Sequence, residues 1–209
     1  MKKIVVMLIT LLIVYFSIEW IVRGIHFVVF KSNTYVSFVS PILHWAKYFA
    51  VAFILIWVFK KYVTLAPAGK LIIPILLILT SAMFFISSLW FQAVNEEEIV
   101  KHGVFLHTVK TWDEVDHVST EIHHEEKVIL DVPNNLKPSK VNVKYNIHFK
   151  DGTAVNVWND LESMHELHQF VLENNIDVEY LTDTEHFDQN FAYYFKDSLE
   201  KAHIVFGVE

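Results

Sequence analysis

The chain turns from apolar to acidic within residues 71–100, which read LIIPILLILTSAMFFISSLWFQAVNEEEIV. Positions 71–95 are 25 residues without Asp, Glu, Lys or Arg, and three glutamates follow at once. A helix rises about 1.5 Å per residue and a bilayer core is about 30 Å thick, so about 20 apolar residues can cross it. The stretch therefore predicts a membrane span over 71–93, joined without a linker to a water-soluble part.

Charge is distributed unevenly on the two sides of this junction. Residues 1–93 hold eight Lys/Arg and one acid, whereas residues 94–209 hold nine Lys/Arg and 23 acids, so the parts carry +7 and −14 and sum to −7. The apolar share of 53% is also high for an ordinary soluble domain. These values predict a transmembrane region over 1–94 and an acidic soluble domain over 95–209.

Two further segments reach spanning length, 4–22 and 41–59, so we expect three transmembrane helices. Glu19 and Arg23 are four residues apart and are expected to pair at the membrane edge. The apolar stretch 25–30 is too short to span and is expected to lie at the interface. The first segment lacks a small-x-small cleavage site, which favours an uncleaved anchor over a signal peptide.

The basic residues predict the orientation, because Lys and Arg are enriched in cytoplasmic loops. With three spans, five lysines lie on one side and three basic residues on the other. The first group is Lys2, Lys3, Lys60, Lys61 and Lys70, and the second is Arg23, Lys31 and Lys47. This predicts a multi-pass protein of the cell membrane, with a cytoplasmic amino terminus and an extracytoplasmic soluble domain.

The soluble part has the pattern of an α+β domain. Val141–Phe149 alternates apolar and polar residues, and Asp151-Gly152 then turns the chain into 153–158, which predicts a β-hairpin. Asn159 or Asp160 is expected to cap a helix that follows. Shorter strand-like stretches precede the hairpin at 99–106, 117–123 and 127–132.

A last helix is predicted near the carboxyl end. Thr182 and Glu185 have capping-box spacing, and Phe187, Phe191 and Phe195 then recur every four residues. This apolar edge could dock on its own domain or meet a partner protein. The three phenylalanines are therefore the candidate partner-binding residues.

The order of these elements carries a family resemblance. A strand begins directly after a membrane helix at 99–105, a Thr-Trp-Asp-Glu-Val turn follows at 111–115, and a hairpin and a capped helix complete the order. This order resembles the bacterial membrane proteins that carry a pleckstrin-homology-like (PH-like) domain. The resemblance implies an antiparallel β-sheet capped by a helix, here with an extra C-terminal helix, and a non-enzymatic role in organising proteins at membranes.

The chain departs from the lipid-binding members of that fold. Those members bind anionic lipids through clustered Lys and Arg in the early strands, where this chain has Lys101 and Lys110 among many acids. A domain of charge −14 is repelled by anionic headgroups, so we expect no anionic-lipid binding by the soluble domain.

Ten of the twelve histidines lie in the soluble part and raise the question of a metal site. His123 and His124, followed by two glutamates, are the densest group, and imidazoles with carboxylates suit zinc. Neighbouring residues of a strand point to opposite faces, so these two are weak metal candidates and a solvated hairpin tip explains them better. His165 and His168 are three apart, and His168 falls on the apolar side of its predicted helix, which favours a core position.

Other searches exclude several classes of function. The chain has no cysteine, no Walker or dinucleotide loop and no G-x-S-x-G elbow, and it has only five glycines. It shows no basic stripe for nucleic acid. We therefore expect no catalytic residues and no cofactor.

The function that fits these patterns is a non-catalytic membrane protein that presents a PH-like, protein-binding domain, with a regulatory or assembly role. A metal- or pH-responsive sensor that uses the histidines is the alternative. A transport or membrane-enzyme subunit is a third, and it would depend on ionisable groups within the spans, namely Glu19, His44 and Lys47.

Overall fold

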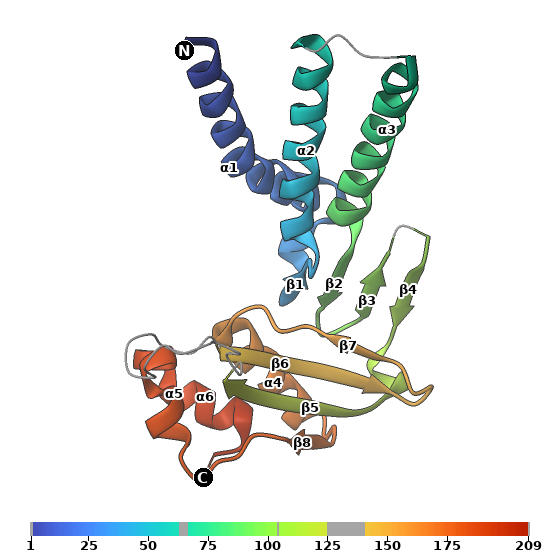
Figure 1. The fold of residues 1–209 in the computed structure, drawn as a ribbon. Helices are drawn as coiled ribbons and strands as arrows, with labels where there is room; N and C mark the ends of the chain where they lie inside the picture. Colours follow the sequence, from blue (N-terminus) through green and yellow to red (C-terminus); the bar gives the residue numbers. More distant parts are fainter. Residues whose placement is uncertain (1, 63–66, 104, 125–140, 209) are drawn as a thin grey trace. The chain divides into compact units, whose positions relative to one another are not determined.

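The computed structural model describes residues 2–62, 67–103, 105–124 and 141–208 (Figure 1). It divides into two compact units, which we call the helical unit and the sheet unit and describe separately. The helical unit comprises Met1–Thr34, Ser40–Phe91 and Lys101–Thr108. The sheet unit comprises Tyr35–Val39, Gln92–Val100 and Val109–Glu209.

The helical unit is built from α1 (Lys2–Phe30), α2 (Leu43–Tyr62) and α3 (Pro67–Leu89), with α2 packed against both others (Figure 1). The first helix is longer than expected, because it continues without a break until Lys31 adopts a left-handed φ of 50°. Residues 25–30 are therefore part of α1 and of its apolar stretch Leu11–Phe30, and their place at the interface stays a prediction. A short 3₁₀ helix, η1 (Ser32–Thr34), follows.

Two of these helices, not three, are by themselves long and apolar enough to cross a membrane within the described residues. They are Leu11–Phe30 in α1 and Gly69–Leu89 in α3. In α2 the apolar stretch is the shorter Leu43–Val58, which contains Lys47. The prediction of three spans over 4–22, 41–59 and 71–93 is thus corrected in number and in bounds.

The apolar side chains of α1 and α3 face outward rather than into a protein core. Phe16, Trp20 and Ile78 are 67%, 79% and 70% exposed. Only 11% and 17% of the two spanning windows are buried, whereas the core helix of a soluble protein would be mostly buried. Such a continuous apolar surface is not stable in water and requires a non-aqueous surrounding or a partner.

A charged cluster joins α1 to α2. The Glu19 carboxylate accepts a hydrogen bond from Arg23 Nη2 at 2.7 Å, which confirms the predicted pair. Its other oxygen accepts from Lys47 Nζ of α2. The carboxylate therefore pairs with both neighbouring cations, including the lysine within the apolar part of α2, and the cluster keeps a net charge of about +1.

The first sheet has the strand order β1-β2-β3-β4. Its first strand comes from the connection between α1 and α2 and pairs antiparallel with β2, Ser37 opposite Val94. A three-residue strand shows no readable alternation, which is why the sequence did not predict β1. The strands are β1 (Ser37–Val39), β2 (Phe91–Val94), β3 (Ile99–His102) and β4 (His107–Lys110), followed by η2 (Trp112–Glu114).

The second sheet has the order β7-β6-β5-β8. The predicted hairpin is confirmed as β6 and β7, with Gly152 at φ 80° in its turn. The strand β8 joins β5 in parallel, which the sequence did not indicate. The expected strand at 127–132 lies outside the described residues. The strands are β5 (Val115–His124), β6 (Val141–Phe149), β7 (Ala154–Asn156) and β8 (Val178–Tyr180).

One face of this second sheet packs on helices to form the core. The Asp160 side chain caps α4 by accepting from Ser163 N at 2.9 Å, as predicted. Buried residues of β5 and β6 share one cluster with buried residues of the three helices. These helices are α4 (Leu161–Glu173), α5 (Phe187–Phe195) and, after η3 (Lys196–Ser198), α6 (Leu199–Phe206).

The predicted C-terminal helix is divided, because Lys196 takes a left-handed φ of 49° and separates α5 from α6. Phe187, Phe191 and Phe195 are 1%, 4% and 7% exposed, and they lie in the domain's own core. They have no surface to offer a partner in this conformation. Their role as partner-binding residues remains a prediction that would require α5 to leave the core.

A buried polar chain crosses this core. His168 of α4 is fully buried, which confirms its predicted core position. Its Nδ1 lies 3.3 Å from the Tyr145 hydroxyl and its Nε2 lies 3.3 Å from the Tyr180 hydroxyl. Burial lowers the pKa of His168 to about 4, so the imidazole is neutral at physiological pH.

This neutral histidine predicts acid sensitivity of the fold. The unfolded chain binds the His168 proton near pH 6.5 and the folded chain only near about 4, so stability falls as pH falls through that window. The loss is on the order of 3 kcal/mol when complete. His168→Gln should flatten this pH dependence in denaturation of the full chain in detergent, whereas His186→Gln, at the exposed start of α5, should not. An unchanged slope in His168→Gln would contradict the assignment.

Candidate functional site

The face of the second sheet opposite the helices is the candidate site. Along β6 the side chains at 143, 145, 147 and 149 are buried in the core, and the intervening ones point to the other face. Pairing extends this face over β5, β7 and β8. We call it the polar face: His117, Ser119, Glu121, His123, Asn142, Lys144, Asn146, His148, Asn156 and Glu179.

A stacked pair of imidazoles occupies one end of the polar face. His117 and His148 lie opposite each other on β5 and β6, with ring centroids 4.3 Å apart and ring planes 9° from parallel. His117 also lies between two carboxylates, with Nδ1 3.0 Å from Asp116 Oδ2 and Nε2 3.7 Å from Glu179 Oε2. Each imidazole can therefore become a cation beside the other, and the two carboxylates flank His117.

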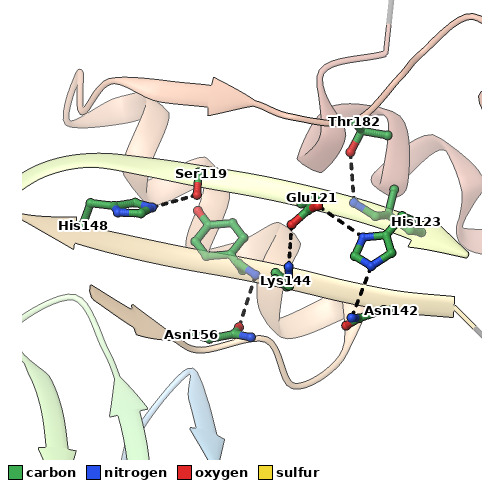
Figure 2. Close-up of polar contacts among 10 residues, drawn as sticks. Ser119, Glu121, His123, Asn142, Lys144, His148, Asn156 and Thr182 are labelled. Atoms are coloured by element: carbon green, nitrogen blue, oxygen red, sulfur yellow. Dashed lines mark hydrogen bonds and ion pairs between the residues drawn. The ribbon is translucent and has the colours of Figure 1, made fainter. Parts of the chain in front are cut away.

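The environment of His148 disfavours its protonation. Partial burial lowers the pKa of His148 and the charge of His117 lowers it further, while Glu179 and Asp116 act in the opposite direction. Its Nε2 lies 2.8 Å from Ser119 Oγ (Figure 2). We therefore expect His148 to be neutral when His117 carries the proton.

A second charged group lies further along the face (Figure 2). Glu121 accepts from Lys144 Nζ at 2.8 Å across the β5–β6 pair, and this bond is the largest reason why the pKa of Glu121 is lowered. His123 Nδ1 lies 3.2 Å from Glu121 Oε1, close enough for a charge interaction but not aligned for a hydrogen bond. Its other nitrogen is 3.4 Å from the Asn142 amide.

The weak metal candidates His123 and His124 are separated by the pleat, as a regular strand requires. His123 belongs to the polar face, whereas the His124 ring stacks on Phe191 of α5 at 4.9 Å. Within the described part of the chain, no three His, Cys, Asp or Glu side chains gather to hold a metal ion. Among the described residues these two histidines therefore do not share a metal site, and Glu125 and Glu126 of the same predicted group lie outside the described residues.

Ser119 and His148 have the spacing of a nucleophile and its base, so catalysis needs a separate test. Ser119 is 2% exposed and lies in the middle of a regular strand, between its ladder partners. A hydroxyl in that position cannot reach a substrate carbonyl or phosphorus. The contact therefore orders the imidazole and does not activate the serine.

A shallow pocket lies at the start of α5, a region in which no site was predicted from the sequence. It has a volume of about 240 Å³, and its lining includes Thr184, His186 and His203. His203 Nε2 lies 2.6 Å from Asp188 Oδ1, and this pair is partly exposed to solvent. The volume is below the roughly 300–1,000 Å³ of typical small-molecule sites, which makes the polar face the stronger candidate.

Sequence reasoning singled out His123, His124 and the three phenylalanines but not the His117–His148 pair. The alternation of Val141–Phe149 already placed His148 on the outer row. The local pattern could not predict the β5–β6 register, which brings His117 opposite His148. It also could not predict the parallel pairing of β8, which brings Glu179 close to His117.

Comparisons with protein-family models, with curated proteins and with solved structures found no match for this chain. Function is therefore inferred from the exposed apolar surface of the helices and from the side chains of the polar face.

The stacked pair gives a direct prediction for His148. His117→Asn removes the neighbouring positive charge, so the pKa of His148 should move up toward its ordinary value, although burial will still hold it below that value. Nuclear magnetic resonance of the labelled imidazole, titrated in the full chain in detergent, measures this shift. A matched His165→Asn substitution on α4 should leave the titration of His148 unchanged, and a downward shift in His117→Asn would contradict the stacking.

Proposed function

We propose that the protein is a non-catalytic integral membrane protein that presents a PH-like domain beside the bilayer and binds a protein partner through the polar face. The observation that carries this proposal is the outward apolar surface of α1 and α3, combined with a sheet face made of mutually paired polar side chains. The first feature supports a membrane location, and the second supports recognition rather than chemistry.

Contacts within the helical unit support three crossings. Ser40 Oγ donates to Trp90 O at 2.7 Å, so the chain entering α2 lies beside the end of α3. His26 Nε2 donates to Ser88 O at 2.6 Å and places the end of α1 there too. If α1 and α3 both cross toward this end, α2 must carry the chain back, and its 20 residues span about 30 Å.

The lysine within α2 is compatible with such a crossing. A charged side chain in a bilayer is costly unless it is paired or reaches the interface. Lys47 is bound by Glu19 of α1, whose carboxylate also holds Arg23. We therefore propose that this cluster lies near one membrane surface, with the amino terminus cytoplasmic and the sheet unit on the other side.

The strand order supports the PH-like resemblance. Four strands form the first sheet, β5, β6 and β7 follow as an antiparallel series, and α4 then packs on the second sheet. Two features depart from the pattern, because β1 precedes α2 in the chain and β8 adds a parallel strand. We propose a PH-like domain with these additions.

The polar face suits a protein partner for a physical reason. Its histidines and asparagines are short side chains that donate and accept hydrogen bonds, and many are already ordered by neighbours on the sheet. Ordered side chains lose little entropy on binding. Since residues 94–209 carry a net charge of −14, we propose that the partner offers a basic surface.

Photo-crosslinking tests the proposed surface. A photoreactive amino acid at Asn146, on the polar face, should give one discrete protein adduct in native membranes, whereas the same group at exposed Asn190 of α5 should not. Glu121→Gln should weaken the adduct, because it removes the carboxylate that holds Lys144. Glu162→Gln is the matched control, since Glu162 pairs with Lys201 elsewhere. Equal adducts at both positions, or no adduct at Asn146, would count against the proposal.

The stacked imidazoles favour a second candidate function, a pH-responsive partner interaction. If both His117 and His148 were protonated, two positively charged rings would lie with their centroids 4.3 Å apart and would repel each other. Because the pKa of His148 is lowered from its ordinary value, we expect the Asn146 adduct to decrease only as the pH falls below about 6.5, and His148→Asn to remove that decrease. Crosslinking that is independent of pH in the unmodified chain would exclude this second function and leave the first intact.

A further inference from the structure

The connection between β3 and β4 presents two large apolar side chains to the surroundings. Phe105 is 91% exposed and Leu106 is 76% exposed. Gly103 N donates to Leu106 O at 2.7 Å and closes the turn that holds them. These residues form an apolar tip, which we define as Gly103, Phe105 and Leu106.

The base of this tip is fixed to the end of α3. His102 Nδ1 donates to Leu89 O, the last residue of the helix, at 2.8 Å. The His102 ring stacks on Phe91 with centroids 4.8 Å apart and planes 3° from parallel, and Phe30 of α1 lies 5.3 Å away. All these residues belong to the helical unit, so the tip has a defined place beside the ends of α1 and α3.

The direction of the chain carries the tip back alongside α3. The turn closed by Asn95 N and Glu98 O, 3.1 Å apart, reverses the chain after β2, so that β3 returns toward the helix end. At His102 it is level with Leu89. Phe105 and Leu106 follow His102 in the same unit, so the tip lies beside the end of α3.

The surroundings of the tip are apolar and lack acidic residues. Phe27, Val28 and Val29 near the end of α1 are 57%, 76% and 63% exposed. Residues 101–110 contain two lysines and no Asp or Glu, although residues 94–209 hold 23 acids. Residues 101–110 themselves carry no negative side chain for anionic headgroups to repel, unlike the rest of the acidic domain.

We propose that the apolar tip inserts Phe105 and Leu106 into the bilayer interface beside α3 and forms a second, non-helical contact with the membrane. This inference depends on the proposed membrane location of α1 and α3. The occupant is lipid rather than a protein, because the tip continues the outward apolar surface of those helices at the same end. Insertion of this kind depends on apolar area and does not require anionic lipid.

The absence of cysteine from the chain allows a clean test with single labels. The full-length protein, reconstituted in phosphatidylcholine vesicles, would carry an environment-sensitive fluorophore at Phe105→Cys or Leu106→Cys. Ile78→Cys on α3 is the lipid control and Glu173→Cys on α4 is the water control. Quenching is measured with lipids brominated on the acyl chain and with aqueous iodide.

The inference predicts that labels at 105 and 106 are quenched by brominated lipid and protected from iodide, as at Ile78. Quenching by iodide alone, as at Glu173, would overturn it while Ile78 still reports a membrane helix. Protection from both quenchers would also overturn it, because it would show a protein contact. If Ile78 itself is reached by iodide and not by brominated lipid, the proposed membrane location has failed instead.

Discussion

The antiparallel pairing of β1 with β2 is the constraint on which the path of the chain depends. It ties a three-residue strand from the α1–α2 connection to the strand that leaves α3. The neighbouring bond from Ser40 Oγ to Trp90 O continues this link into the helical unit. Once the start of α2 and the end of α3 are adjacent, α2 must run opposite to both of its neighbours. The charged residues Glu19 and Lys47 then meet between α1 and α2, where each compensates the other.

The second sheet separates two kinds of polar chemistry by the alternation of its strands. Inward, Tyr145 and His168 are fully buried, Tyr180 links His168 to the surface, and the imidazole is neutral. Outward, His117 and His148 are only partly covered and face carboxylates. The same residue type therefore serves packing on one face and, in the function we propose, recognition on the other. The difference arises from burial and charge, not from sequence position alone.

Local patterns predicted the parts of the fold that depend on neighbouring residues. The β6–β7 hairpin, the Asp160 cap and the Glu19–Arg23 pair all depend on contacts within a few residues. The sequence missed β1 and β8, because strands of three residues show no readable period. It also predicted a single C-terminal helix, although the positive φ of Lys196 ends α5 after the three phenylalanines and α6 follows as a separate helix. The site was less predictable still, because the approach of His117 to His148 depends on strand register.

Register and long-range pairing thus supply what the local patterns lack. A shift of the β5–β6 pairing by one residue would place the polar row in the core, so the buried row fixes the polar face. The helices show the same division. Their composition predicts an outward apolar surface, whereas the direction of α2 follows only from its contacts with α1 and α3. The proposed function depends on two surfaces, the outward apolar surface of α1 and α3 and the polar face of the second sheet, and both form only in the folded chain.

We propose that the chain crosses the membrane three times and places residues 2 and 173 on opposite sides. Single cysteines at Lys2 and at Glu173 would be labelled in intact cells with a membrane-impermeant thiol reagent. We expect the reagent to reach position 173 in intact cells and position 2 only after the membrane is permeabilised. Labelling of both positions under the same condition would contradict three crossings.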